Sequence, residues 1–301
     1  MKSYFGLIFL FFTTIIWAQY FPKTESANVL PYWEKGDNFE YTQNEKEYQV
    51  NKQDTLIKKN ISFDLTVNIL DKTDDSYQIE WIINQDFNQF PPLIREQFAT
   101  QLGAQKFIYQ TDQNGAFQTL INFEDIVAYN KKMVEILGAT IQNENEKEAF
   151  KTALEKVFGN EEVTEQLIAS KINTFHLFYG SHIKKNKPTK SKFQTVNPVT
   201  KNKIIYNRSF LIEEYNEEDE TYSLYAETMP QKSNLLEEVK TTLETIISKE
   251  VKDMDQYNNF DYISKVYQAT HNSGVILYQI KRDFIEIDEI EIIKELEFIL
   301  K

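Results

Sequence analysis

The three histidines are the first residues to test for acid–base or metal chemistry. His176, His182 and His271 form no HExxH motif and no other pair at metal-ligand spacing on a helix. His176 and His182 are six residues apart, so on one strand they would share a face but lie about 20 Å apart, too far for one metal ion. We interpret each histidine as a surface or half-buried side chain and predict no metal site.

Nucleophilic and nucleotide-dependent chemistry also lack their motifs. Ser181 precedes His182, but neighbours on a strand point to opposite faces, and the flanking glycines of a GxSxG elbow are missing. The chain has no cysteine, which excludes thiol nucleophiles, thiolate metal sites and disulfides. Its eight glycines form neither a GxGxxG motif nor a P-loop, so we predict no cofactor.

Carboxylates are abundant, and a glycosidase needs two of them facing each other across a sugar. The pairs Asp74-Asp75 and Glu217-Glu218-Asp219 fall in predicted turns, where solvated charge is the ordinary role. The stretch FIYQTDQNGAFQTL, residues 107–120, could pass for a calcium loop but lacks the alternate oxygen ligands and the glutamate of one. Its Asn114-Gly115 pair instead predicts a tight hairpin. We therefore predict a protein that is not an enzyme, with a carboxylate-based hydrolase as the less favoured alternative.

Aromatic side chains are the most informative positive feature, with 22 Phe and 17 Tyr in the chain. Many of them fall on predicted strands beside the presumed core. They can be ordinary core and cross-strand pairs, or they can line an apolar groove between sheet and helices that binds a lipid or another apolar ligand. The candidate ligand-binding residues are Tyr48, Tyr77, Trp81, Tyr206, Tyr222 and Tyr225.

The net charge of −13 argues against nucleic acid as a partner, because binding to phosphates requires a cationic surface. The exception is the lysine-rich segment KKNKPTKSK, residues 184–192. It reads as a solvated loop, or alternatively as a contact with an anionic surface or polymer. The candidate interaction residues are Lys184, Lys185, Lys187, Lys190 and Lys192.

The N-terminus predicts export. Lys2 precedes an apolar run over Tyr4–Trp17, and the small residue Ala18 suits the position before a cleavage site. The run is shorter than the roughly 20 apolar residues that a spanning helix needs. We therefore expect a cleaved signal peptide over residues 1–18, a soluble mature chain without a transmembrane anchor, and a periplasmic or extracellular location.

Period-two alternation predicts antiparallel strands. Apolar residues recur at every second position over residues 61–69 and again over residues 77–83, with a polar turn between the two runs. Three-to-four spacing predicts helices over residues 123–171, and Ser233 is placed to cap a further helix that runs to about Val251. The last residues, 290–300, fit a strand or a helix equally well.

These elements predict an α+β fold, in which a curved antiparallel sheet or half-barrel packs on helices. Two smaller separate domains are the alternative. Each half reads as hairpin, proline stop, helix and hairpin, which predicts a repeated hairpin-helix-hairpin layout. We divide the chain into a first sheet-forming half over residues 19–122, a helical connection over 123–175 and a second sheet-forming half over 176–301.

Three features together carry a resemblance: the Ala18-Gln19 end of the leader, the segment Trp33-Glu34-Lys35-Gly36-Asp37 before the first strand, and the Asn-Gly turn. With these features the chain resembles exported proteins of flavobacteria and their relatives, in the phylum Bacteroidota. The expected architecture is also similar to the periplasmic lipoprotein-carrier fold, which implies binding of acyl chains.

Two functions from different classes follow. The first is an exported non-catalytic binding protein for a lipid or another apolar small molecule. The alternative is an envelope scaffolding or protein-interaction module whose partner is an envelope protein or a surface polymer.

Overall fold

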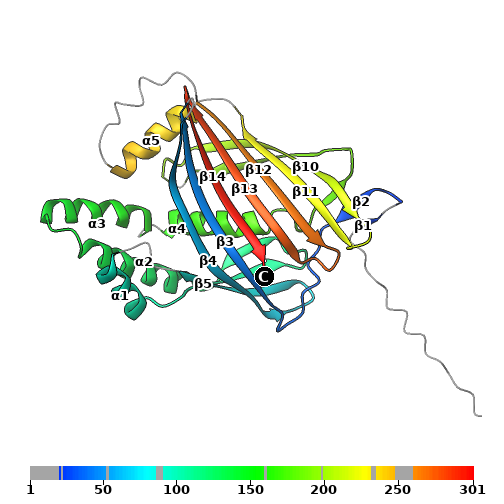
Figure 1. Cartoon of the computed structure of the whole chain (residues 1–301), viewed down its shortest axis with the longest axis horizontal. Coiled ribbons are helices and arrows are strands. Elements are labelled where there is room, and N and C mark those ends of the chain that lie inside the picture. Colours follow the sequence, from blue (N-terminus) through cyan, green and yellow to red (C-terminus); the bar gives the residue numbers. More distant parts are fainter. Residues whose placement is uncertain are drawn as a thin grey trace, which may run out of the picture.

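The structure, a computed structural model, describes residues 20–21, 23–51, 54–85, 91–158, 161–197, 199–231, 235–247 and 260–301. The predicted signal peptide and Ser233 lie outside these residues. Within them the fold is α+β, built from one large antiparallel sheet, one small sheet and five helices (Figure 1). No helix within the described ranges is long and apolar enough to cross a bilayer.

Eleven strands form the large sheet in the order β7-β6-β5-β4-β3-β14-β13-β12-β11-β10-β9, so that β7 and β9 are its edges. The strands are β3 (Asn38–Asn51), β4 (Asp54–Lys72), β5 (Ser76–Gln85), β6 (Gln105–Asp112), β7 (Phe117–Leu120), β9 (Thr189–Val196), β10 (Lys203–Asn216), β11 (Thr221–Pro230), β12 (Phe260–His271), β13 (Ile276–Ile287) and β14 (Ile290–Leu300). The small sheet has the order β1-β2-β8 and consists of β1 (Tyr20–Phe21), β2 (Ser26–Asn28) and β8 (His182–Lys184).

The C-terminal strand, β14, lies between a strand from the second half of the chain and a strand from the first half. β14 pairs with β13 on one side and with β3 on the other, where Phe298 lies opposite Gln43. A run that fits a strand or a helix equally well becomes a strand here, because both of its edges find hydrogen-bond partners. One continuous sheet therefore contains strands from both halves of the chain.

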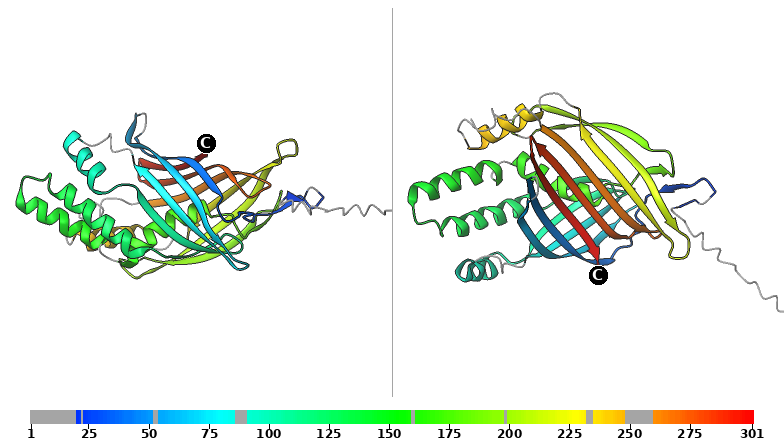
Figure 2. Two further views of the ribbon diagram at one scale, coloured as in Figure 1. Left: turned by 90° about the horizontal axis from the view of Figure 1, so that it is seen from below. Right: turned by 45° about the horizontal axis from the view of Figure 1, so that its top comes forward.

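The sheet curls, and its concave face holds the core (Figure 2). Inward residues alternate with outward ones, so that Leu65, Val67 and Ile69 on β4 are almost fully buried. Helix α4 (Glu161–Phe175) runs along this concave face, and the Phe175 carbonyl accepts a hydrogen bond from Gln279 Nε2 on β13. Aromatic residues on the inner face thus pack against a helix rather than against a second sheet.

The other helices gather mainly at one end of the sheet (Figures 1 and 2). They are α1 (Pro92–Gln101), α2 (Phe123–Gly138), α3 (Glu144–Phe158) and α5 (Leu235–Ile247). Helix α2 packs against α1, α3 and strand β6, and α3 also contacts α4. This arrangement brings α2 and α4 to the same end of the concave face.

The chain that follows α4 fills the centre of the concave face. His176 is 4% exposed, which corrects the prediction of a surface or half-buried side chain. Its Nδ1 lies 2.8 Å from the Gly115 carbonyl, and its Nε2 lies 2.7 Å from the Tyr109 hydroxyl. Because a carbonyl only accepts, Nδ1 carries the proton and Nε2 accepts from Tyr109. The sequence pattern could not show this, because both partners come from a distant hairpin.

Edge-to-face aromatic contacts surround this histidine. Trp33 packs on it with ring centroids 5.8 Å apart, and Trp33 also packs on Tyr179 at 5.1 Å and on Tyr77 at 5.4 Å. We call the group Trp33, Tyr77, Tyr109, His176 and Tyr179 the aromatic centre. Burial of the neutral imidazole holds the pKa of His176 at about 3, and the hydrogen bond with Gly115 opposes this shift only in part.

The hairpin predicted over residues 107–120 is present as β6 and β7. Asp112 Oδ1 accepts hydrogen bonds from the backbone N–H groups of Asn114 and Ala116, so this carboxylate holds the turn itself. Gly115 has a φ of 86°. A Cβ at this position would lie 3.0 Å from Pro31 and from Tyr179, so only glycine lets the turn pack against the aromatic centre.

Candidate functional site

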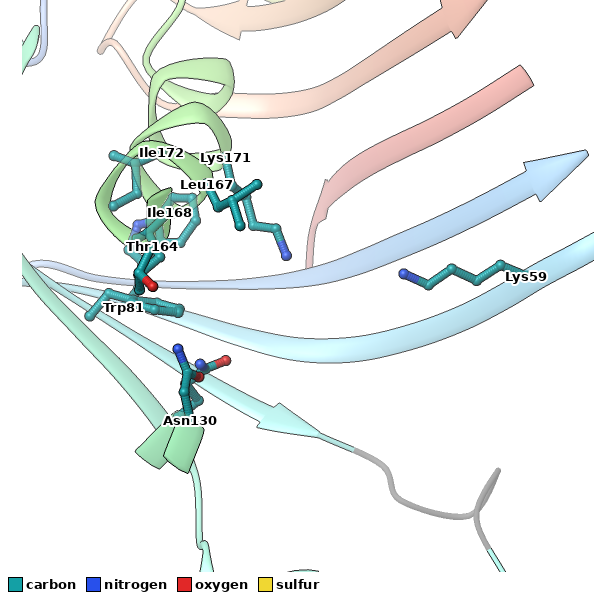
Figure 3. Close-up of a pocket in the computed structure, with 10 residues that line it drawn as sticks. Lys59, Trp81, Asn130, Thr164, Leu167, Ile168, Lys171 and Ile172 are labelled. Atoms are coloured by element: carbon teal, nitrogen blue, oxygen red, sulfur yellow. The ribbon is translucent and has the colours of Figure 1, made fainter. Parts of the chain in front are cut away.

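An open cavity of about 480 Å³ lies between α4, α2 and the inner face of the sheet (Figure 3). This volume falls within the range of small-molecule sites in proteins. We call it the Trp81 cavity. Its lining residues are Lys59, Trp81, Gln105, Phe107, Asn130, Thr164, Leu167, Ile168, Lys171 and Ile172.

Helix α4 supplies half of this lining from one side. Leu167 and Lys171 are four residues apart, as are Ile168 and Ile172, so all four project from neighbouring positions of the helix. Ile172 is 1% exposed, but Leu167 is 52% exposed although it lies beside the sheet. The helix therefore buries one part of its apolar surface and presents another part to the cavity.

The sheet side of the cavity is aromatic. Trp81 on β5 is fully buried and packs edge-to-face on Phe175, with ring centroids 5.2 Å apart. Phe107 on the neighbouring strand β6 lies directly opposite Trp81 in the register. Because strand neighbours fix both rings, this wall is preformed.

Two buried polar residues, Asn130 and Thr164, line the cavity beside this apolar wall. Asn130 on α2 is 5% exposed and points toward Trp81 (Figure 3), and its amide makes no hydrogen bond with any residue that the structure describes. The open cavity gives solvent access to this amide. Asn130 is thus available to a polar group of a ligand in the cavity.

A cluster of charges stands at the side of the cavity nearest β3 and β4. Glu45 on β3 accepts from Lys171 Nζ at 2.7 Å and from Lys59 Nζ at 2.5 Å. Gln43 Nε2 donates to the same carboxylate at 2.8 Å. Burial opposes ionisation of Glu45, but the two ammonium groups outweigh it and hold the pKa of this carboxyl at about 2.

The structure brings only one of the six predicted ligand-binding residues, Trp81, to the cavity. Tyr77 lies in the aromatic centre, where its hydroxyl donates to the Pro31 carbonyl at 3.0 Å. Tyr222 is 1% exposed within the core, on β11. Tyr206 lies at the far edge of the sheet, stacked on Phe193 with ring centroids 5.3 Å apart.

The other two predicted residues lie on the convex face. The Tyr48 hydroxyl contacts Glu295 Oε2 at 3.5 Å, and the Tyr225 hydroxyl donates to Glu227 at 3.0 Å. In β3 the inward positions are those of Gln43 and Glu45, so Tyr48, an odd number of residues away, points outward. These tyrosines form cross-strand polar contacts and line no part of the Trp81 cavity.

The lysine-rich segment runs from the last residue of β8 into β9 and lines no part of this cavity. Lys184, Lys187, Lys190 and Lys192 are exposed, and Lys185 is half-buried, with its Nζ 3.9 Å from Glu25. The candidate acidic pairs, Asp74-Asp75 and Glu217-Glu218-Asp219, are exposed in strand turns and line no part of the cavity.

Sequence reasoning did not single out Asn130, Leu167, Lys171, Lys59 or Glu45. The spacing of Leu167, Ile168, Lys171 and Ile172 is visible as a helical stripe in the sequence. It does not tell which strands face that stripe, because the pairing with Glu45 spans 126 residues.

Comparison with known proteins gave no family assignment. No protein-family model matches this chain, and no curated protein matches it. The geometry of the cavity is therefore the basis for inferring function.

Proposed function

We propose that this chain is an exported binding protein that takes an apolar or amphiphilic small molecule into the Trp81 cavity. The observation that carries the proposal is the cavity of about 480 Å³, which is lined by an exposed leucine, Leu167, and by the amide of Asn130. Packed protein cores fill such space, because each unfilled volume costs free energy. The signal peptide predicted for residues 1–18 supports export.

The cavity itself supports binding without catalysis. Its polar lining residues are two amides, a threonine and two lysines, and these lining residues include no histidine and no carboxylate. Of these, Lys171 and Lys59 already contact Glu45. Apolar walls with a few polar groups are typical of sites that hold a ligand by shape and orient it by hydrogen bonds.

Fluorescence offers a direct test, because Trp81 lines the cavity while Trp33 lies in the aromatic centre. A bromine-labelled long-chain fatty acid and the matching alcohol should quench wild-type tryptophan fluorescence. In Trp81→Phe the remaining quenching should be small, since Trp33 lies in the aromatic centre and lines no part of the cavity. Equal quenching in both proteins, or none with either ligand, would contradict the proposal.

Native mass spectrometry of protein purified from its own host provides the second test. We expect a co-purified apolar molecule and a mature chain that begins at Gln19. A clean apo mass together with no uptake of fluorescent fatty acids would rule out this function, and retention of residues 1–18 would rule out cleavage of the leader.

A second candidate is an interaction module for an envelope partner, an anionic surface or a polymer. It is supported by Lys184, Lys187, Lys190 and Lys192, which are exposed and form no ion pair within the described part of the chain. Replacement of all four by glutamine should reduce co-sedimentation with anionic vesicles in low salt. Unchanged sedimentation would remove the segment from this candidate.

We also propose that the two halves repeat one hairpin-helix-hairpin unit. The order β4-β5-α1-β6-β7 along the chain parallels the order β10-β11-α5-β12-β13, and the second hairpins turn at Gly115 and Gly274, with φ of 86° and 84°. An experimental structure in which only single hairpins of residues 54–120 and 203–287 superpose would contradict the repeat.

A further inference from the structure

Beside the Trp81 cavity, positively charged side chains outnumber negatively charged ones. Lys59 and Lys171 share the single carboxylate of Glu45, which leaves a surplus of one positive charge. The other lysines of this inner face are paired one to one: Lys281 with Asp283 at 2.9 Å and Lys294 with Glu47 at 3.6 Å. This local surplus of positive charge contrasts with the net charge of −13 of the whole chain.

The geometry leaves donors for a ligand. Lys171 and Gln43 both donate to Glu45 Oε1, and Lys59 donates to Oε2, so each carboxylate oxygen is occupied. An ammonium group has three N–H donors, and one from each lysine is used in these contacts. The side chains of Lys59 and Lys171 are 41% and 35% exposed, whereas that of Glu45 is 17% exposed, so a ligand meets the lysines first.

The same two lysines line the cavity together with apolar side chains. Lys171 lies one helical turn from Leu167, which is 52% exposed, and Figure 3 shows its ammonium on the side of the helix that faces toward Lys59. A molecule lying along Leu167 and Trp81 would thus have its polar end at the lysines. An uncharged apolar molecule would leave the surplus charge unused.

We propose that the ligand of the Trp81 cavity is an amphiphile with one acidic head group, which docks between Lys59 and Lys171 while its apolar chain lies against Leu167 and Trp81. This inference rests on the proposed function and specifies the chemical class of its ligand. Carboxylate and phosphate head groups share the chemistry that the two ammonium groups recognise.

The test compares the affinities of dodecanoate, dodecyl phosphate, dodecanol and dodecyltrimethylammonium, measured by displacement of a fluorescent apolar probe in low salt at about pH 8, where both acids are ionised. We expect the acids to bind about tenfold more tightly than the alcohol, since hydrogen bonds between charged groups have this effect. The cationic amphiphile should bind weakest, and the ratio of the two acids identifies the head group.

Three variants change the local charge by known amounts. Lys171→Gln should lower dodecanoate affinity about tenfold and leave dodecanol affinity unchanged, whereas Lys171→Arg should restore the preference. Glu45→Gln removes the competing carboxylate and should raise dodecanoate affinity. Lys294→Gln is the matched control, because this lysine also faces a glutamate on the inner face but lines no part of the cavity.

The outcomes distinguish a failure of the acidic head group from a failure of the proposed binding function. Binding of dodecanol and dodecanoate with equal affinity, in wild type and in Lys171→Gln, would refute the acidic head group but leave apolar binding intact. Displacement by none of the four compounds would refute the proposed function itself. Thermal unfolding of each variant shows whether it is folded, and Lys171→Arg tests the charge requirement should Lys171→Gln not fold.

Discussion

The aromatic centre and the Trp81 cavity lie on the same concave face and are built from the same kinds of residue, but they differ in how they are filled. In the aromatic centre every ring meets another ring, and His176 has a partner on each nitrogen. At the Trp81 cavity, about 480 Å³ stays open and the Asn130 amide has no partner among the described residues. The residues of the aromatic centre fill their space completely, whereas the lining of the cavity leaves space open on the same face.

The largest effect is expected from Gly115→Ala. The substitution forces a Cβ into Pro31 and Tyr179 at 3.0 Å and strains a φ of 86°. We expect the free energy of unfolding to fall by about 3–4 kcal/mol, measured by denaturant titration. Gly36→Ala is the matched control, because its φ is 93° but its Cβ would meet nothing within 4 Å; it should cost only about 1–2 kcal/mol. Equal losses would show that the turn does not pack tightly on the aromatic centre.

The next effect is expected from His176→Leu. It leaves the Tyr109 hydroxyl and the Gly115 carbonyl buried without a partner, so we expect a loss of about 2–3 kcal/mol near neutral pH.

This loss should depend on pH. The folded pKa of His176 is about 3, below its ordinary value of 6.5, so the unfolded state binds the proton first as the pH falls. Wild-type stability from this residue is fully present above about pH 6.5 and declines by about 1.4 kcal/mol per pH unit toward about pH 3. The difference in stability between wild type and His176→Leu should therefore narrow as the pH falls below about 6.5 and change sign in stronger acid. A gap that stays constant from neutral to acid pH would mean that the imidazole is not held neutral.

At the cavity, substitutions should affect binding rather than folding. Leu167→Glu places a charge on an apolar wall, and we expect binding of the fluorescent apolar probe to weaken by about tenfold or more. Stability should change by less than about 0.5 kcal/mol, because Leu167 is 52% exposed. Leu56→Glu is the control: Leu56 is 54% exposed but lies outside the cavity, so probe binding should be unchanged. A large loss of stability in Leu167→Glu would mean that the cavity closes in solution.

The smallest effect has the opposite sign. Asn130→Leu replaces an amide that lines the cavity by an apolar side chain with higher helix propensity, so we expect stability to rise by about 0.5 kcal/mol. A polar side chain kept at a cost to stability is typical of a binding site. A decrease in the melting temperature of Asn130→Leu would place Asn130 with the structural residues of the aromatic centre.

Local patterns in the sequence were enough to predict the hairpin over residues 107–120 and the α+β class. Alternation on β4 and the Asn114-Gly115 turn depend on neighbouring residues, so a sequence displays them directly. Residues 290–300 remained ambiguous for the opposite reason: strand or helix depends on the edges that β13 and β3 offer.

The sequence by itself determined which residues alternate, where turns fall and that the chain carries many aromatic rings. Only the tertiary structure decided the role of each ring, since Trp81, Tyr77 and Tyr48 all sit on strands but lie at the cavity, in the aromatic centre and on the convex face. It also brought Lys171 to Glu45 across 126 residues. The physical reason is that burial and charge pairing depend on contacts between distant segments, which local patterns do not encode.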